Sequence, residues 1–242
     1  LTDDGTRVRA TNFNLDRIFR AGISWTVVTS GKQSFRRTDV GFLFDAAAGI
    51  CQPFDADLSI LISFLNSTVA ELCLGVLNPT INLHPGYIEN LPFDPQRISS
   101  LASELSEKCI SGSRQDWNAY ETSWDFLTSP LVGSHQHEIA VAYLTLRTRW
   151  QTTTSMMRHY EEENNRIIIQ AYGLEAELSP EVPLTEITLT CNPHCRYGSG
   201  HLRKKEWAAL CERVPETCQR LETIAAEMAP EMPGEQRLGL EQ

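Results

Sequence analysis

The chain has 242 residues, which is enough for one large domain or two small ones. Its 41% of hydrophobic residues can form a packed core, and its 21% of charged residues is usual for a soluble protein. Taken as an average, the net charge of -10 argues against a protein that binds nucleic acid.

The charge is unevenly distributed along the chain. Residues 1–40 hold seven Lys or Arg against four Asp, a local balance of +3, whereas no Lys or Arg occurs from Thr38 to Gln96. A surface that faces DNA should therefore include the N-terminal part.

The chain begins at Leu1 and shows no signal-peptide pattern, so we expect an internal fragment of a cytoplasmic protein. The seven cysteines lack the spacing of a disulfide framework, and we expect reduced thiols.

Residues 1–54 are expected to form strands and turns. Ile23–Val28 is rich in β-branched and aromatic residues, and Ser34–Arg36 and Val40–Phe44 are expected to be further short strands. Ser30-Gly31-Lys32 supplies a turn between the first two of these segments.

The clearest helix is predicted over Asp55–Leu77. Asp55 or Asp57 can cap its beginning, apolar residues follow at helical spacing, and Asn78-Pro79 should end it. Its length and apolar character also allow a membrane span. The polar residues within it and the absence of a basic flank favour a buried core helix instead.

The rest of the chain is expected to be mainly helical. Thr80–Phe93 is predicted to be extended, with a turn at His84-Pro85-Gly86. Helical spacing recurs in the segments Gln96–Ile110, Trp117–Phe126 and His135–Tyr172. The expected features of the C-terminal part are an irregular joint at Pro180 and Pro183, a short strand over Glu186–Thr190, a helical segment from Arg203 that is broken at Pro215, and a disordered end over Met228–Gln242.

The expected fold class is therefore α+β. A mixed α/β lobe over residues 1–95 is followed by a mainly helical region over 96–178 and by an irregular joint with a helical tail over 179–242.

Two groups of residues in the first lobe are suited to contacts with DNA. Lys32, Arg36 and Arg37 lie beside the turn formed by Ser30 and Gly31, where side chains and backbone amides can bind phosphates. The same pattern also fits a solvated end of a hairpin.

The second group consists of Asn78, Asn82, His84 and Tyr87, on turns that flank apolar elements. Asn can read adenine through two hydrogen bonds in the major groove, but the formation of caps and turns explains the same residues equally well. Trp25 is expected in the core and not as a platform for base stacking.

Several segments of the chain, taken in order, carry a resemblance to a known family. They are Gly22–Trp25, Ser30–Arg36, Gly41–Asp45, Phe64–Ala70, Leu77–Asn82, Ile88–Phe93, Asp116–Trp117, Glu121–Phe126, Asn165–Ile169, Ala171–Leu174 and Glu177–Val182. Their order resembles that of the large adenine-specific methyltransferases of BREX phage-exclusion systems. The resemblance covers about residues 13 to 197, and the part over residues 60–93 is also similar to target-recognition domains of type I restriction specificity subunits and of fused restriction-methylation enzymes.

This resemblance implies N6 methylation of adenine in a short DNA sequence, with S-adenosylmethionine as the cofactor of the full-length parent. In that family a catalytic domain precedes the region that this chain resembles. The implied partners are double-stranded DNA, the catalytic domain of the parent chain and other proteins of the exclusion system, and no membrane is involved. This chain would then contribute C-terminal target recognition and bind no cofactor itself.

Two segments of the chain could be mistaken for methyltransferase motifs. Phe44–Cys51 follows an apolar run, but Cys51 stands where the cofactor loop needs a second Gly. Adenine methyltransferases need a loop of the type Asn-Pro-Pro-aromatic, whose aromatic ring stacks on a flipped adenine. Asn192-Pro193-His194-Cys195 begins like this loop but lacks the second Pro and the aromatic residue. We therefore assign no catalytic and no cofactor-binding residue, and we expect the isolated chain to be inactive.

Metal and hydrolase chemistry are also weakly supported. Cys191, His194, Cys195 and His201, with Cys211 or Cys218, could supply zinc ligands, but only one paired cluster is present, so scattered thiols are the preferred interpretation. His135 and His137 have no Ser or Cys partner in a recognisable arrangement.

Two alternatives remain open. The chain could be a stand-alone DNA-binding specificity subunit without catalytic activity, or an interaction protein built on the long helix predicted over His135–Tyr172. That helix could pack within the helical region, or it could be a spacer between the recognition and catalytic domains.

Overall fold

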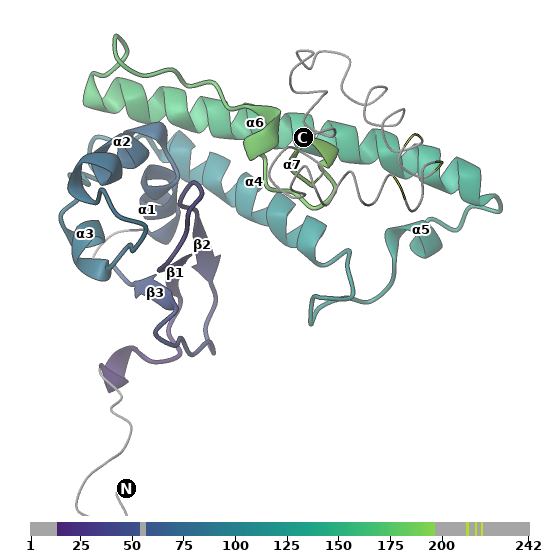
Figure 1. Ribbon diagram of the computed structural model, residues 1–242, viewed down its shortest axis with the longest axis horizontal. Helices are drawn as coiled ribbons and strands as arrows, with labels where there is room; N and C mark the ends of the chain where they lie inside the picture. The colour runs from purple at the N-terminus through teal and green to yellow at the C-terminus, as the bar shows by residue number, and fades with distance from the viewer. Residues whose placement is uncertain (1–13, 54–56, 197–211, 213–215, 217–218, 220–242) are drawn as a thin grey trace, which may run out of the picture. The chain divides into compact units, whose positions relative to one another are not determined.

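A computed structural model describes residues 14–53, 57–196, Glu212, Glu216 and Gln219 (Figure 1). The described residues confirm the α+β class, with a small antiparallel sheet followed by helices. The chain divides into two compact units, of which the first holds residues 1–103 and 167–178 and the second holds residues 104–166 and 179–242. The segment from Arg203 onward, with its expected helix and disordered end, lies outside the described residues except for the three named above.

The first unit contains a three-stranded sheet. After a short 3-10 helix, η1 (Leu15–Arg17), come β1 (Gly22–Thr26), β2 (Phe35–Thr38) and β3 (Ala48–Cys51), in the order β2-β1-β3. Both pairings are antiparallel. One face of the sheet carries the buried residues Ile23, Trp25 and Phe35, and the Trp25 and Phe35 rings lie 5.8 Å apart. The first two predicted strands are thus confirmed, as is the core position of Trp25.

The third strand lies later in the sequence than predicted. Val40–Phe44, expected as a strand, forms a turn in which Gly41 has a φ of 96° and Val40 and Leu43 are exposed. Ala48–Cys51, which belongs to the rejected cofactor-loop candidate Phe44–Cys51, pairs with β1 instead. The reason is steric, because the Trp25 ring occupies the space beside Gly49 that a side chain would need.

The single helix predicted over Asp55–Leu77 is in fact two helices. They are α1 (Leu58–Leu65) and α2 (Thr68–Leu77), which are bent by 67°. Asp57 caps α1 and Asn78 follows the end of α2, as expected. The bend occurs because the Ser67 hydroxyl accepts a hydrogen bond from the Ala70 N–H and starts a new helix.

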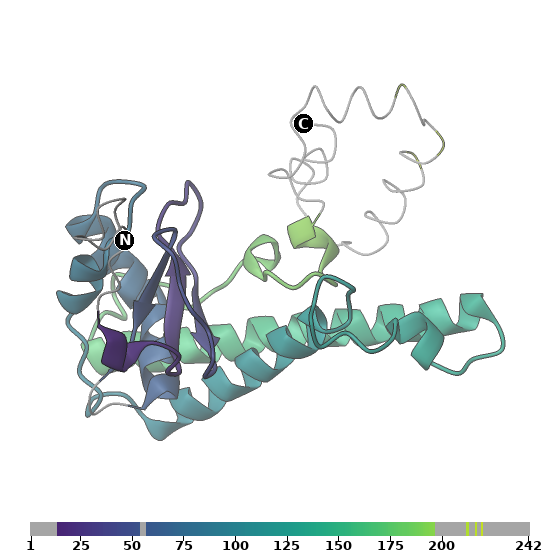
Figure 2. The same ribbon diagram turned by 90° about the horizontal axis from the view of Figure 1, so that it is seen from below.

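Asn66 fixes the position of this bend. Its side-chain oxygen accepts the Phe35 N–H and its amide donates to the Phe35 carbonyl, both at 3.0 Å, so it pairs with the edge of β2. Helix α1 packs against β1 and β2 (Figures 1 and 2).

Among the described residues no single helix is long and apolar enough to cross a membrane. The bent pair formed by α1 and α2 meets the criteria of length and composition for a span, and by those criteria alone.

Two further predictions, over residues 80–93 and 117–126, need correction. The extended stretch expected over Thr80–Phe93 contains a helix, α3 (Pro85–Glu89), in which proline occupies the first turn. Helix α4 (Ser100–Trp117) confirms the expected helix after Gln96 but runs further. The helical spacing of Trp117–Phe126 does not produce a helix beyond Trp117, and Trp124 is fully exposed in a series of turns.

The end of α6 (Ile139–Tyr172) belongs to the first unit and confirms the long helix predicted there. The helix ends before Gly173, whose φ is 69°. The Tyr172 hydroxyl donates to the Pro92 carbonyl at 2.7 Å and accepts the Asp94 N–H at 3.2 Å. Burial is the main cause that raises the pKa of this phenol, so it stays a donor at neutral pH.

The second unit contains most of α4 and α6, the short helices α5 (Pro130–Gly133) and α7 (Pro193–Arg196), and the 3-10 helix η2 (Leu184–Glu186). The strand expected over Glu186–Thr190 is wrong. Asn192 is fully buried and donates to the carbonyls of Leu184 and Ile187, both at 2.7 Å, which closes the segment into turns.

A small apolar cluster forms the core of the second unit. Met157, Val182, Ile187 and Leu189 are buried together, and Cys109 and Cys191 pack against them. Burial raises the pKa of both thiols to about 12, with nearby carboxylates as a further cause. The five described cysteines are free.

Candidate nucleic-acid interface

The structure pairs two segments that adjoin the turns of the two predicted groups. Val28 forms an antiparallel bridge with Asn82, the Leu83 N–H donates to the Val27 carbonyl at 2.7 Å, and the Thr29 N–H donates to the Ile81 carbonyl at 3.1 Å. Residues 27–29 and 81–83 thus form a short two-stranded segment, here called the ribbon, which continues β1. The turn at Ser30–Lys32 follows one strand of the ribbon, and the Asn78–Thr80 turn precedes the other.

The ribbon is attached to the core of the first unit. The Trp25 indole N–H donates to the Leu83 carbonyl at 2.9 Å, and Leu83 itself is buried. The Val27 N–H donates to the Ala47 carbonyl at 3.0 Å. The ribbon therefore has a fixed position relative to the sheet, although its outer side chains are exposed.

The basic turn is held by local contacts. The Gly31 N–H donates to the Thr29 hydroxyl, and the Gln33 amide donates to the Thr26 carbonyl. Lys32 forms an ion pair with Glu71 of α2 at 2.9 Å, in which both side chains are about half exposed. An exposed pair of this kind contributes at most about 1 kcal/mol, so exchange of Glu71 for a phosphate would cost little.

Arg36 and Arg37 point to opposite faces of the sheet because neighbouring residues of a strand alternate. Arg37 lies opposite Ile23 on the face covered by α1 and donates to the Ser59 hydroxyl at 3.3 Å. Arg36 lies opposite Ser24 on the other face and is exposed. Its guanidinium has no partner among the described residues, so Arg36 is better placed than Arg37 to contact a phosphate.

The four residues of the second group have different roles. The Asn78 amide donates to the Asn82 carbonyl at 2.9 Å, and its oxygen accepts the N–H and hydroxyl of Thr80, so Asn78 forms the turn. Asn82 is exposed on the ribbon. His84 is exposed at the start of α3, where its side chain makes no capping bond, and Tyr87 is partly buried in α3.

Several residues of this surface were missed by the sequence analysis. Glu71 and Ser59 hold two of the basic side chains, and exposed Val28 and Ile81 lie on the ribbon beside Asn82. The sequence contains no signal for these pairings because they join segments that are distant along the chain. A polar residue inside an apolar run, such as Asn66, is the one signal that could have indicated the break between α1 and α2.

The two segments that resemble methyltransferase motifs have structural roles. Asn192 uses its amide for Leu184 and Ile187, and its side-chain oxygen accepts the His194 N–H, so no part of this side chain is left to hold an adenine amino group. Residues 44–47 lead into β3 (Ala48–Cys51) of an antiparallel sheet and not into a glycine turn before a helix. Neither of these two segments therefore fits the binding of S-adenosylmethionine.

No three His, Cys, Asp or Glu residues within the described part of the chain lie together as a metal site would require. The backbone N–H groups of Thr190 and Cys191 donate to the Asp116 carboxylate, while His201, Cys211 and Cys218 lie outside the described residues.

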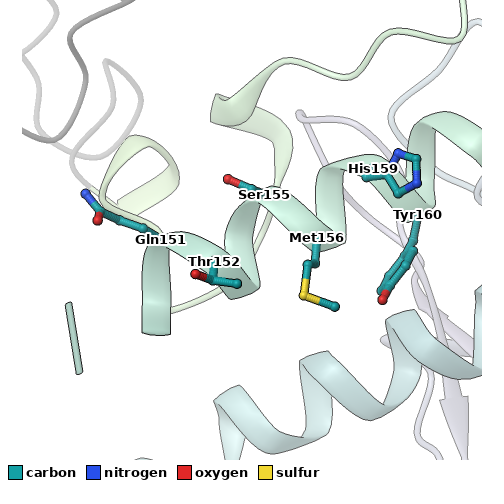
Figure 3. A pocket seen from close by; sticks show the side chains of 6 residues that line it. All are labelled: Gln151, Thr152, Ser155, Met156, His159 and Tyr160. Atoms are coloured by element: carbon teal, nitrogen blue, oxygen red, sulfur yellow. The ribbon is translucent and has the colours of Figure 1, made fainter. Parts of the chain in front are cut away.

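The second unit carries a hollow of about 570 Å³. Figure 3 shows that the labelled side chains come from successive turns of α6. They are Gln151, Thr152, Ser155, Met156, His159 and Tyr160. His159 and Tyr160 have ring centroids 6.0 Å apart, and Lys108 lies 5.3 Å from the Tyr160 ring centroid. The lining contains the hydroxyls of Thr152 and Ser155 but no carboxylate that could orient His159, and the Thr152 hydroxyl donates to the Thr148 carbonyl, so these residues do not form a catalytic arrangement.

Comparison with known proteins gives two relatives of one kind. No protein-family model matches the chain. Over 182 residues, or 72% of its length, the chain is 36% identical to the adenine-specific methyltransferase PglX of Lacticaseibacillus casei strain Zhang. Over 203 residues, or 81% of its length, it is 30% identical to the adenine-specific methyltransferase BrxX of Escherichia coli O9:H4 strain HS. The matches span 15% and 16% of those relatives. The chain is thus homologous to a part of the adenine-specific methyltransferases PglX and BrxX.

Proposed function

We propose that this chain recognises and positions DNA for an adenine-N6-specific methyltransferase of a phage-exclusion system. Methyl transfer would be performed by a catalytic domain of the parent chain, which would bind S-adenosylmethionine. In this proposal the chain corresponds to a C-terminal target-recognition lobe with a helical spacer, and it acts in the cytoplasm on double-stranded DNA.

The observation that carries this proposal is the ribbon. It joins the basic turn at Ser30–Lys32 to the Asn78–Asn82 turn, so that cationic and amide side chains are held near one rigid element. Cations that bind phosphates fix the register of a protein on DNA, and amides can read base edges. Between residues 14 and 53 the chain has five Lys or Arg and three Asp, so this region is positive although the whole chain is acidic.

The proposal is tested by a salt titration of DNA binding. Binding of the 242-residue chain to a fluorescent duplex is measured by anisotropy between low and physiological salt. We expect binding at low salt and a linear fall of log affinity with log salt, because each neutralised phosphate contributes about 0.9 to the slope. We expect Arg36→Ala to flatten the slope by about one such contribution, and the joint change of Lys32, Arg36 and Arg37 to Ala to flatten it further.

Arg166→Ala is the matched control, because Arg166 is an exposed cation of the second unit that pairs with Glu163. It should leave the slope unchanged. Absence of binding at low salt would overturn the proposed function. Binding with a slope that does not respond to the three basic residues would overturn the assignment of this surface.

A further inference from the structure

We propose that the ribbon enters the major groove and that Asn82 reads an adenine of the recognition sequence. This inference rests on the proposed function and names the chemistry of its target. The adenine in question stays stacked in the duplex, and it is therefore distinct from a base that is flipped out for methylation.

A two-stranded β-ribbon is one of the elements that the major groove of B-DNA can admit. The ribbon consists of two short antiparallel segments, closed by two backbone hydrogen bonds on either side of the Val28–Asn82 pair. The bond from the Trp25 indole to the Leu83 carbonyl connects it to the core. Binding through such an element requires little further ordering of the backbone, because the backbone is already held in place.

The Asn82 side chain is available for reading. It is exposed and has no hydrogen-bond partner among the described residues, whereas the backbone N–H of Asn82 donates to the Thr80 hydroxyl and its carbonyl accepts the Asn78 amide. Asn78 and Thr80 thus bond the backbone of Asn82 and leave its side-chain amide available for hydrogen bonds to a base. Of the two candidate asparagines, only Asn82 can make a bidentate contact without breaking the turn.

The chemistry of a primary amide selects adenine. The oxygen accepts the adenine N6–H while the amino group donates to N7, and guanine offers acceptors at both positions. Val28 lies directly opposite Asn82, so the two side chains share one side of the ribbon. Val28 is 55% exposed, and an apolar group there can contact a thymine methyl. The surface is therefore suited to a site that contains A·T pairs.

Selection from randomised duplex DNA by the 242-residue chain tests this inference. The wild-type chain should enrich sequences with adenine at a fixed position, and Asn82→Ala should keep its salt-dependent binding but lose the preference at that position by roughly five- to hundredfold. Asn82→Asp should change the preferred base from adenine to cytosine, because a carboxylate accepts from the cytosine amino group. This second variant provides a gain of preference that unfolding cannot imitate.

The selected duplex with 7-deazaadenine at that position should bind the wild-type chain more weakly but bind Asn82→Ala no more weakly than unmodified DNA. Asn90→Ala is the control, because the exposed Asn90 donates to the Gly86 carbonyl away from the ribbon. An adenine position that is unaffected by both Asn82 variants, or enrichment without a fixed adenine, overturns the inference and leaves DNA recognition intact. A wild-type chain that enriches no DNA overturns the proposed function as well.

Discussion

At the scale of single residues, a few side chains decide the arrangement of the first unit because each contacts the backbone of a distant segment. Asn66 bonds both backbone groups of Phe35, Trp25 bonds the Leu83 carbonyl, and the Tyr172 hydroxyl bonds Pro92 and Asp94. A hydrogen bond within a protein contributes about 1 kcal/mol, but loss of one partner leaves a buried group unsatisfied and costs more. These contacts therefore stabilise one register over its alternatives.

The contact between Gly49 and Trp25 gives a prediction at this scale. A Cβ at Gly49 would lie 2.2 Å from the indole ring, which is itself fixed by its bond to Leu83. We expect Gly49→Ala to lower the free energy of unfolding by roughly 1–3 kcal/mol, the usual cost of overpacking a core. Urea unfolding followed by tryptophan fluorescence measures this change.

Gly75→Ala is the matched control, because Gly75 lies inside α2 with nothing within 4 Å of its added Cβ. Alanine there should raise the free energy of unfolding by roughly 0.5–1 kcal/mol, since glycine is the poorer helix former. Equal effects of the two substitutions would show that the contact with Trp25 does not set the position of β3.

At the scale of elements, the sequence predicts those parts whose pattern is local. Helix α6 follows from apolar spacing and from Gly173, and β1 follows from its β-branched and aromatic residues. The position of β3 does not follow from a local sequence pattern. Val40–Phe44 has the better strand composition, yet Ala48–Cys51 pairs with β1 because Gly49 fits beneath Trp25. Tertiary packing overrides strand propensity at this point.

The same distinction applies to the candidate interface. The composition of the Ser30–Arg37 segment indicated cations on a turn, and the strand pattern then places Arg36 and Arg37 on opposite faces. Sequence alone gave Asn78 and Asn82 equal weight. They differ in that the Asn78 side chain closes the turn, through the Asn82 carbonyl and the Thr80 hydroxyl, whereas the Asn82 side chain does not. Only the folded conformation of residues 78–82 shows this difference.

The division of the predicted helix over 55–77 leads to a prediction at this scale. The Ser67 hydroxyl caps α2 through the Ala70 N–H and is buried. We expect Ser67→Ala to lower the free energy of unfolding by roughly 0.5–2 kcal/mol, the usual cost of removing an N-cap. Ser63→Ala is the control, because Ser63 is also buried but donates to the Ile60 carbonyl within α1 instead of capping a helix. A larger loss at Ser63 than at Ser67 in thermal unfolding would contradict the role of the cap.

At the scale of the whole molecule, the two units differ in the chemistry that they offer. The first unit presents the ribbon, an exposed Arg36 and exposed amides, and the second unit has a small apolar core against which two partly buried thiols pack. Helix α6 contributes residues to both units, with 167–172 in the first and 139–166 in the second. This division fits a recognition element joined to a helical scaffold, which is the arrangement that the proposed function requires.

The last prediction concerns the reaction of the whole chain. We expect the purified 242-residue chain to transfer no methyl group from S-adenosylmethionine to DNA, because Asn192 is committed to backbone carbonyls and residues 44–51 enter a strand pair. Incorporation of labelled methyl groups into duplex DNA measures this activity. The full-length PglX of L. casei, of which the matched part is 15%, serves as the reference under the same conditions. Labelled N6-methyladenine formed by the chain alone, at a rate that falls when Asn192 is changed to Ala, would show that the catalytic residues lie within the chain and that the division of labour proposed here is wrong.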